Sequence, residues 1–232
     1  MISVNGYKGL YIVYDGIVGC GKSAQIARLK EVLPEDFPGI DIIFTYEPGG
    51  NPEADKIRDR VKHEKMSPLD EVMLFAQSRS ITLPEIVRPA LERGGLVVSD
   101  RSFTTSLDYQ GIGRGVGLDE VWRINEPIVK NTFPDLLVIP RVGLEASMKR
   151  SSGDRPDKFD EEGINFIQTC FDGYPYMTEF LHKISTQTRI VQIDDHEGKI
   201  GIDEMGKEIE MRLYPFIESW INEGGVVRER QR

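Results

Sequence analysis

The stretch Gly16-Ile17-Val18-Gly19-Cys20-Gly21-Lys22-Ser23 decides the fold of this 232-residue chain. It matches the pattern G-x-x-x-x-G-K-[ST], follows an apolar run at residues 10–14, and leads into a helical pattern at residues 23–30. A strand, a glycine-rich loop and a helix in this order are the context of a phosphate-binding loop, or P-loop. Backbone N–H groups and the positive end of the helix dipole attract phosphate there. The motif therefore predicts a nucleoside triphosphate site rather than a glycine-rich turn without a ligand.

The different residue types inside this loop are expected to bind different parts of the nucleotide. We expect Gly16, Gly19 and Gly21 to wrap the phosphates at close range, because glycine carries no side chain. The ammonium group of Lys22 is expected to reach the β and γ phosphates, and the hydroxyl of Ser23 to bind Mg²⁺. ATP and Mg²⁺ are therefore the expected cofactors.

Composition narrows the class of protein. The net charge of −9 disfavours a nucleic-acid polymer as the main partner. The only cysteines, Cys20 and Cys170, indicate a reducing compartment rather than a disulfide scaffold. No run approaches the roughly 18 apolar residues that a membrane helix needs. We expect a cytoplasmic protein, without a membrane or nucleic-acid partner, that binds a small phosphorylated ligand through local arginines.

Five nearly continuous apolar runs predict the strands of one sheet, at residues 10–14, 40–45, 96–99, 136–139 and 190–193. Runs of this kind suit strands that are buried on both faces of a parallel sheet. Helical patterns separate them, at residues 69–92, 118–131, 144–150, 162–183 and 202–220. The alternation predicts a doubly wound α/β fold with ligands at the carboxyl ends of the strands. We expect one domain over residues 1–222 and a charged, mobile tail over residues 223–232.

Three further polar clusters accompany these elements. The sequence E-P-G-G at residues 47–50 predicts a rigid turn, which either shapes a site or only redirects the chain. Phe75 and Arg79 lie one helical turn apart. There they either bind a base edge or belong to the core and the solvated surface. Asp100 and Arg101 directly follow a predicted strand and suit Mg²⁺ and a phosphate respectively.

Taken in order, these motifs resemble those of the thymidylate kinase family of nucleoside monophosphate kinases. The family motifs are a P-loop, E-P-G-G, L-F-A-x-x-R, D-R followed by Y-Q-G, P-D-L, and an arginine-rich lid that ends in D-R. Here they occupy residues 16–23, 47–50, 74–79, 100–101 with 109–111, 134–136 and 149–155. The resemblance implies a P-loop kinase fold of three layers, with a five-stranded parallel sheet and a short mobile lid at about residues 149–158. It also implies a homodimer.

The resemblance further implies how an acceptor nucleotide is held. Phe75 would stack on its base, Arg79 would hydrogen-bond the exocyclic oxygen, and Thr105 or Ser106 would touch the base edge. Tyr109 would crowd the ribose 2′ position and so favour deoxynucleotides. Two more acceptor positions implied by the motifs are Glu47 and Gln110.

For the phosphates, the resemblance implies that Arg58 and Arg101 hold the acceptor monophosphate. Asp100 would work with Mg²⁺, directly or through water. The assignments of Asp100 and Arg101 agree with the chemistry of a carboxylate and a guanidinium at the end of a strand.

The lid is expected to complete the catalytic set. Some thymidylate kinases carry an arginine inside the P-loop and others supply it from the lid, and here Gly19 occupies the in-loop position. Arg150 and Arg155 would therefore close over the transferring group and act together with Lys22 and Arg101. Considered without the family, the same segment is also compatible with a solvated charged loop.

Three positions depart from the family pattern, and each bears on acceptor recognition. Val18 stands where the family has a carboxylate for the sugar 3′-hydroxyl, Ser102 replaces an aromatic residue, and Tyr46 replaces an arginine. Asp15 is a candidate to reach the sugar in place of the missing carboxylate.

The sequence therefore predicts ATP- and Mg²⁺-dependent phosphorylation of a deoxynucleoside monophosphate, with thymidine monophosphate (dTMP) as the first candidate acceptor. Another or a modified pyrimidine deoxynucleotide is the alternative within the same chemistry. A nucleotide-dependent switch is disfavoured because no N-K-x-D motif occurs. A nucleotide-binding module without transfer activity stays open.

Overall fold

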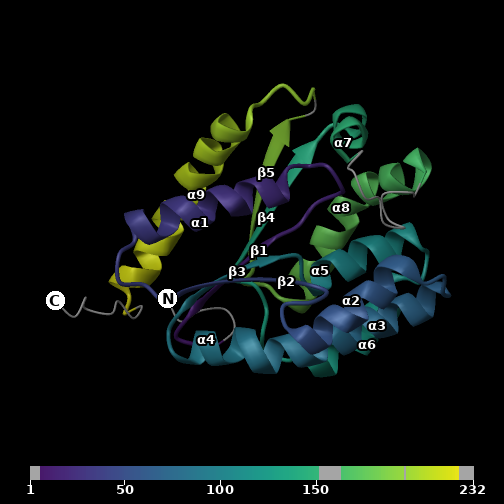
Figure 1. Ribbon diagram of the computed structural model, residues 1–232, viewed down its shortest axis with the longest axis horizontal. Helices are drawn as coiled ribbons and strands as arrows, with labels where there is room; N and C mark the ends of the chain where they lie inside the picture. Colours follow the sequence, from purple (N-terminus) through teal and green to yellow (C-terminus); the bar gives the residue numbers. More distant parts are fainter. Residues whose placement is uncertain (1–5, 152–162, 196, 225–232) are drawn as a thin grey trace.

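Five parallel strands form the centre of the computed structural model, which describes residues 6–151, 163–195 and 197–224. The strand order is β2-β3-β1-β4-β5, so β1 lies in the middle (Figure 1). The strands are β1 (Leu10–Tyr14), β2 (Ile42–Tyr46), β3 (Leu96–Asp100), β4 (Leu136–Val142) and β5 (Arg189–Asp195). Every residue of β1 is buried, as its unbroken apolar sequence predicts for a central parallel strand. The expected five-stranded parallel α/β sheet is confirmed.

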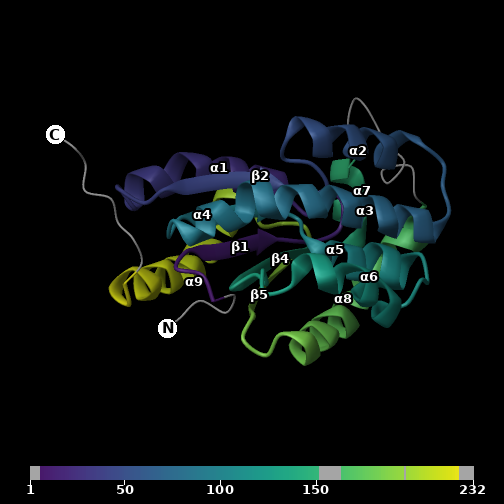
Figure 2. The ribbon, with the colours of Figure 1, turned by 90° about the horizontal axis from the view of Figure 1, so that it is seen from below.

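Helices cover both faces of this sheet. The α-helices are α1 (Lys22–Asp36), α2 (Pro52–His63), α3 (Pro68–Thr82), α4 (Arg88–Glu92), α5 (Phe103–Ser106), α6 (Leu118–Val129), α7 (Leu144–Ser151), α8 (Ile164–Ile184) and α9 (Ile202–Asn222). Two π-helical segments join them, η1 (Leu83–Val87) and η2 (Leu107–Gly113). Helices α1 and α9 pack on one face, and α4 packs on the other beside α3 and α6 (Figures 1 and 2). The result is a three-layer arrangement.

The observed strand boundaries differ from the predicted ones mainly where polar residues lie at the ends of the strands. β2 starts at Ile42 rather than at residue 40, and β4 and β5 continue to Val142 and Asp195. The two last strands stay in register as far as the pair Val142 and Asp195. Backbone pairing therefore extends beyond the apolar residues from which the strands are predicted.

The helix expected at residues 69–92 is three segments, because two prolines interrupt it. Pro84 lies at the start of η1 and Pro89 at the start of α4. A proline has no N–H for the hydrogen-bond ladder, and a π-helical turn is one way in which a helix absorbs that loss. The chain after β3 also becomes π-helical, in η2, which carries Tyr109 and Gln110.

Helix α2 is not among the helices that the sequence analysis predicts. Its first turn is capped by Asn51, whose side-chain oxygen accepts hydrogen bonds from the N–H groups of Glu53 and Ala54. Pro52 occupies the first helical position, where its missing N–H costs nothing. The helix packs along α3 and forms one wall above the carboxyl ends of the strands.

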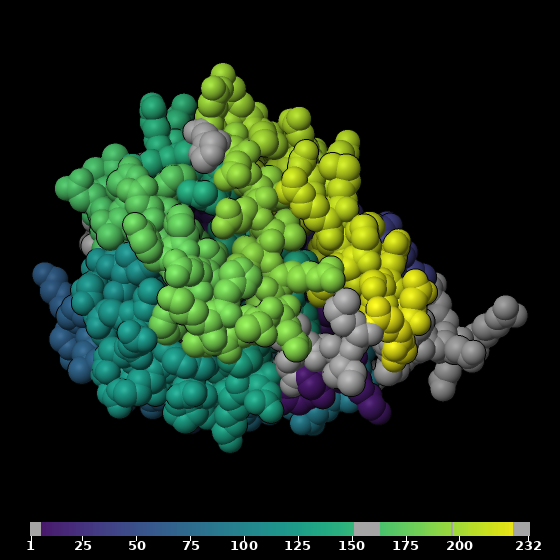
Figure 3. Space-filling model, turned by 180° about the vertical axis from the view of Figure 1, so that it is seen from behind, coloured from purple at the N-terminus to yellow at the C-terminus, as the bar shows by residue number. Residues whose placement is uncertain are grey.

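Seen from behind, the surface passes from α6 through α8 to α9, in teal, green and yellow (Figure 3). Within residues 6–151, 163–195 and 197–224, no helix combines the length and the apolar character that a membrane crossing requires. The expected tail begins at the end of α9, and residues 225–232 lie outside the described part.

Candidate active site

A cavity of about 230 Å³ lies at the carboxyl ends of β1 and β3, beside the P-loop. This is the position that parallel α/β sheets favour for ligands. The cavity is lined by Val18, Gly19, Lys22, Ser23, Pro48, Arg58, Val61, Lys62, Phe75, Asp100, Arg101, Thr105 and Tyr109. Residues of the P-loop, of the strand end after β3 and of α2 and α3 thus meet at one place.

The P-loop has the backbone form that its glycines predict. Gly21 has a φ of 97° and caps α1 in the left-handed conformation, which is costly for other residues. A Cβ at Gly19 would lie 2.1 Å from the carbonyl oxygen of Ser147, so a side chain has no room there. Nζ of Lys22 donates to the carbonyl oxygens of Gly16 (2.9 Å) and Ile17 (3.0 Å). The loop is therefore a closed cradle with its lysine folded along it.

Tyr109 forms the wall between the P-loop and the end of β3. Its hydroxyl accepts the N–H of Val18 at 3.0 Å, and the Arg101 guanidinium lies 5.0 Å from its ring centroid. Burial raises the pKa of Tyr109, although Arg101 lowers it in part. The phenol therefore stays neutral, and the ring is fixed by two polar neighbours.

Asp15 lies behind the cavity wall and is not among the lining residues. Its carboxylate accepts hydrogen bonds from the hydroxyls of Thr104 (2.6 Å) and Thr105 (2.7 Å) and from the N–H of Gly16 (2.8 Å). The side chain of Asp15 is fully buried, and Arg101 lies 3.8 Å away. The predicted contact with a substrate sugar stays a prediction, because this geometry favours a supporting role for Asp15 beneath Thr105.

The backbone at Arg101 is held in an unusual conformation. Its φ is 72°, a region that non-glycine residues occupy at a cost of about 1–3 kcal/mol and that is enriched at functional sites. Two hydrogen bonds fix it: its N–H donates to Tyr14 O (2.8 Å), and its carbonyl accepts from Ser99 Oγ (2.7 Å). The strained turn directs the side chain toward the cavity.

The charge of Arg101 is secured by its surroundings. Burial lowers the pKa of the guanidinium, but Tyr109 and the nearby carboxylates of Asp15 and Asp100 outweigh it, and the net pKa lies above the ordinary value. A positive charge that is permanent and partly desolvated suits an anionic ligand.

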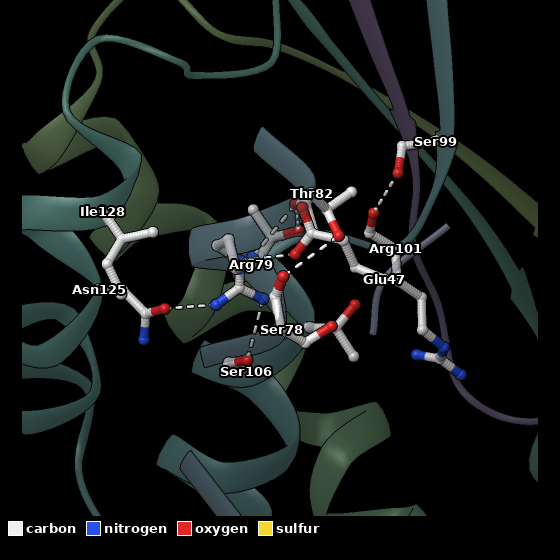
Figure 4. Close-up of polar contacts among 12 residues, drawn as sticks. Glu47, Ser78, Arg79, Thr82, Ser99, Arg101, Ser106, Asn125 and Ile128 are labelled. Carbon is white, nitrogen blue, oxygen red and sulfur yellow. Dashed lines mark hydrogen bonds and ion pairs between the residues drawn. The ribbon is translucent and has the colours of Figure 1, made fainter. Parts of the chain in front are cut away.

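Glu47 and Arg79 form a buried ion pair, with Nε of Arg79 2.6 Å from the Glu47 carboxylate (Figure 4). The guanidinium also donates to Asn125 and, at 3.4 Å, to Ser106. Burial raises the pKa of Glu47, and the arginine opposes that rise. Of the helical pair Phe75 and Arg79, only Phe75 lines the cavity. The expected contacts of Arg79, Glu47 and Ser106 with a substrate stay predictions.

Helix α3, which carries Phe75 and Arg79, also holds the E-P-G-G turn in place. Ser78 Oγ accepts the N–H of Gly49 at 2.9 Å, and Thr82 Oγ1 donates to the carbonyl of Gly49 at 2.6 Å (Figure 4). The peptide bond between Glu47 and Pro48 is cis. The turn is thus part of the wall of the site and not only a change of chain direction.

Three other expected site residues lie away from the cavity or outside the described part. Gln110 is buried, and its amide donates to Glu71 Oε1 at 2.7 Å. Arg150, on α7, donates to the carbonyl of Gly198 at 3.0 Å and lies 3.8 Å from Asp195. Arg155 lies outside the described residues. Their roles stay predictions.

The cavity wall that α2 supplies was not predicted from the sequence. Val61 and Lys62 line it together with Arg58, and Pro48 contributes from the preceding turn. Positions 58, 61 and 62 share one helical face. A signal for this was present, since a capped helix with an arginine on its inner face begins directly after the turn.

A second cavity of about 480 Å³ adjoins the first between α1 and β2. Both cavities are lined by Ser23, Arg58, Asp100 and Arg101. One carboxylate oxygen of Asp100 is buried without a hydrogen-bond partner among the described residues. An acceptor oxygen and a serine hydroxyl therefore lie at the junction of two cavities, which suits a hydrated cation between two phosphate groups.

This fold and this site define a P-loop α/β phosphotransferase of the nucleoside monophosphate kinase class. The sequence model of thymidylate kinase matches residues 14–194. The chain belongs to the thymidylate kinase family.

Individual relatives agree with this assignment. A thymidylate kinase of Synechococcus sp. (strain CC9605) is 37% identical over 178 residues, which cover 74% of this chain and 85% of that protein. One from Caldanaerobacter subterraneus is 35% identical over 200 residues, or 85% of this chain and 93% of that protein. The crystal structure of thymidylate kinase from Ehrlichia chaffeensis superposes with a TM-score of 0.69 at 23% identity, covering 89% of this chain and 98% of that one, and supports the fold.

Proposed function

We propose that this protein transfers the γ-phosphoryl group of ATP to dTMP and releases ADP and thymidine diphosphate. The observation that carries the proposal is the single cavity in which the P-loop residues Lys22 and Ser23 face Phe75, Arg58 and Arg101. A donor triphosphate and an acceptor monophosphate are thereby given adjoining sites.

The reaction needs position and charge rather than a nucleophilic side chain. An oxygen of the acceptor phosphate bonds to the γ-phosphorus as the bond to the β-phosphate oxygen breaks, with charge spread over the transferring group. Fixed cationic groups in a partly desolvated site stabilise that charge without reorganising. Lys22 and Arg101 are the described residues that meet this requirement.

On the donor side, the P-loop holds the β and γ phosphates through its backbone N–H groups at Gly16, Gly19 and Gly21 and through Lys22. Ser23 and Asp100 fit Mg²⁺, because a hydroxyl and a carboxylate oxygen without a protein partner lie at the junction of the cavities. The ion would supply charge neutralisation between the phosphates.

On the acceptor side, Phe75 stacks on the base and Tyr109 fills the space beside the sugar. Arg58 and Arg101 hold the monophosphate, each from a different wall of the cavity. Thr105 lines the same space, with its hydroxyl oriented by Asp15. Glu47, Arg79, Ser106 and Gln110 act behind this surface as its support or reach the base edge after side-chain adjustment.

The lid arginines complete the proposal. Because Gly19 leaves the P-loop without an arginine, Arg150 and Arg155 are assigned to the transferring group. Arg155→Ala is expected to lower kcat about 10³-fold or more, as for other arginines that act in phosphoryl transfer. ATP affinity measured by calorimetry should change far less, and a loss of affinity with kcat intact would show that the residue only binds.

The decisive experiment is an acceptor panel. The protein, ATP and Mg²⁺ are mixed with each deoxy and ribo monophosphate in turn, and diphosphate product is separated by chromatography. The proposal expects dTMP to have the highest kcat/KM. A protein that binds ATP but forms no diphosphate from any acceptor would be a binding module instead.

The second candidate acceptor is another or a modified pyrimidine deoxynucleotide, because Val18 departs from the family pattern at a position for acceptor recognition. Val18 lines the cavity at the position where the family has a carboxylate, and a valine side chain accepts no hydrogen bond from a 3′-hydroxyl. dTMP and its 3′-deoxy analogue are therefore expected to have kcat/KM values within about tenfold of each other, which corresponds to about 1.4 kcal/mol. A hundredfold preference for dTMP would mean that another residue, with Asp15 the first to mutate, reads the hydroxyl.

The assembly and setting follow from the same assignment. We infer a cytoplasmic homodimer with one catalytic domain over residues 1–222. Leu69 and Met73, 47% and 52% exposed, lie one turn apart on α3 and form an apolar pair on its outer face. Light scattering after size-exclusion chromatography tests the dimer, and Met73→Lys is expected to weaken it.

A further inference from the structure

We infer that Tyr46 is a positioning residue for the acceptor phosphate, because its ring holds the guanidinium of Arg58 at the rim of the cavity. The inference rests on the proposed function, in which Arg58 binds that phosphate. It concerns a contact that the family motifs do not contain, since Tyr46 is one of the departures from them.

The contact is a cation lying over an aromatic face. The central carbon of the Arg58 guanidinium is 5.0 Å from the centroid of the Tyr46 ring, and its NH1 donates to the carbonyl of Pro48 at 2.8 Å. Arg58 lines both cavities, whereas Tyr46 lines only the one between α1 and β2. The ring therefore supports the arginine from the side away from the acceptor site.

The ring itself is fixed from two further directions. Its hydroxyl donates to Asp55 Oδ1 at 2.9 Å, and the same oxygen accepts the N–H of Gly50 at 3.2 Å. Burial and this hydrogen bond raise the pKa of Tyr46, so the phenol remains a donor. A Cβ at Gly49 would come within 2.3 Å of the ring, so the glycine lets the ring lie against the turn.

These contacts fix the end of β2 and helix α2 relative to each other. Asp55 and Arg58 are three residues apart on α2, so they lie on one face of the helix. Tyr46 ends β2 and leads into the E-P-G-G turn. A half-exposed arginine otherwise loses side-chain freedom when it binds a phosphate, and a guanidinium already held by a ring and a carbonyl loses less.

The test compares two substitutions. Tyr46→Leu removes the aromatic face and the hydroxyl, and Tyr46→Phe removes only the hydroxyl. Tyr46→Leu is expected to raise the KM for dTMP about tenfold, as loss of a cation–π contact and of pre-organisation predicts. The KM for ATP should stay within about twofold, and Tyr46→Phe should keep the dTMP KM within about threefold. Tyr176→Leu, an equal change at an exposed site on α8, is the matched control and should alter neither constant.

Two further measurements localise the effect. In the Arg58→Ala background, Tyr46→Leu should change the dTMP KM less than about twofold, because the ring acts through that arginine. In calorimetry, Tyr46→Leu should weaken dTMP but not thymidine, which lacks the phosphate. If Tyr46→Leu loses its cooperative thermal transition, Tyr46→Gln takes its place, since it keeps a donor for Asp55 and has no aromatic face.

The outcomes separate the inference from the proposed function. Wild-type protein that neither binds nor phosphorylates dTMP overturns the proposed function. Active wild type with an unchanged dTMP KM in Tyr46→Leu, effects that add in the double variant, or an equal loss of thymidine binding overturns only the role of Tyr46. An acceptor-specific effect that vanishes without Arg58 supports it.

Discussion

Two walls of the cavity present an arginine to the same space, and they hold it in different ways. Arg101, on the β3 wall, has a strained backbone held by Tyr14 and Ser99 and lies beside the buried carboxylate of Asp15. Arg58, on the α2 wall, is held by one carbonyl and one exposed ring. The first arrangement is built into the sheet, whereas the second depends on local contacts at the surface. Substitutions on the β3 wall should therefore affect rate and fold together, and those on the α2 wall should mainly adjust affinity.

The largest effect is expected for Arg101→Ala. Removing this charge takes away transition-state stabilisation and leaves Asp15 without its cationic neighbour, so kcat/KM for dTMP should fall by about 10³-fold. Steady-state kinetics measures the loss. Arg93→Ala, which removes an arginine from a surface ion pair with Asp41, is the matched control and should retain full activity. A loss below tenfold would mean that the arginine on the β3 wall contributes no more to catalysis than the one on the α2 wall.

A smaller effect is expected for Arg58→Ala. A charged hydrogen bond to a phosphate contributes about 1.5–3 kcal/mol, so the KM for dTMP should rise about 10- to 100-fold while kcat changes little. Measuring both constants separates the contributions. If kcat falls as much as in Arg101→Ala, the α2 wall acts in the transition state and the contrast between the walls is wrong.

Tyr109 tests whether the β3 wall also selects the sugar. Tyr109→Ala should lower the preference for dTMP over its ribo counterpart by at least about tenfold, because the fixed ring leaves no room for a 2′-hydroxyl. Tyr109→Phe keeps the ring and removes the hydroxyl that accepts the N–H of Val18, so it should keep the preference. Wild type that uses deoxy and ribo monophosphates equally would show that Tyr109 has another role.

The last effect concerns stability rather than activity and comes from Asp108, behind the β3 wall. Both of its carboxylate oxygens are buried without a hydrogen-bond partner among the described residues. Burial and then Asp15 raise its pKa well above the usual range, against the opposing charge of Arg101. On α8, Gly173 and Tyr174 face the same group.

A raised pKa means that the folded state binds more protons at Asp108 than the unfolded state does. The free energy of unfolding should therefore fall as pH rises above about 4, by about 1.4 kcal/mol per unit, until the folded pKa is passed. Asp108→Asn should remove that fall and raise the denaturation midpoint at pH 7–8. Asp172→Asn, an exposed neighbour on α8, is the control. Equal pH profiles for wild type and Asp108→Asn would contradict the assignment.

The sequence predicted the part of the site whose geometry is local. The P-loop motif defines its own backbone, so Lys22 and Ser23 lie where their spacing places them. The apolar runs likewise predicted the five strands, because burial on both faces leaves no polar alternation to confuse them. The features that depend on short-range sequence patterns were therefore predictable.

Contacts between distant segments were not predictable in the same way. Phe75 and Arg79 share a helical face, yet only Phe75 reaches the cavity, because Glu47 and Asn125 bind the arginine from a turn and from α6. Helix α2 is the opposite case, since its cap Asn51 and its first-turn Pro52 are helix-start signals in the sequence, yet no helix is predicted there. Only the fold shows that the inner face of α2 lines the cavity.

The junction between the P-loop and α7 has a mechanical consequence. Ser147 Oγ donates to the carbonyl of Val18, and the carbonyl of Ser147 leaves no space for a side chain at Gly19. Any displacement of α7 is therefore transmitted to the backbone that faces the donor phosphates. Because such coupling is reciprocal, a ligand that tightens the loop also biases the position of α7 and of the arginine that it carries. The close contact at Gly19 thus links binding of the donor phosphates to the position of the far end of α7.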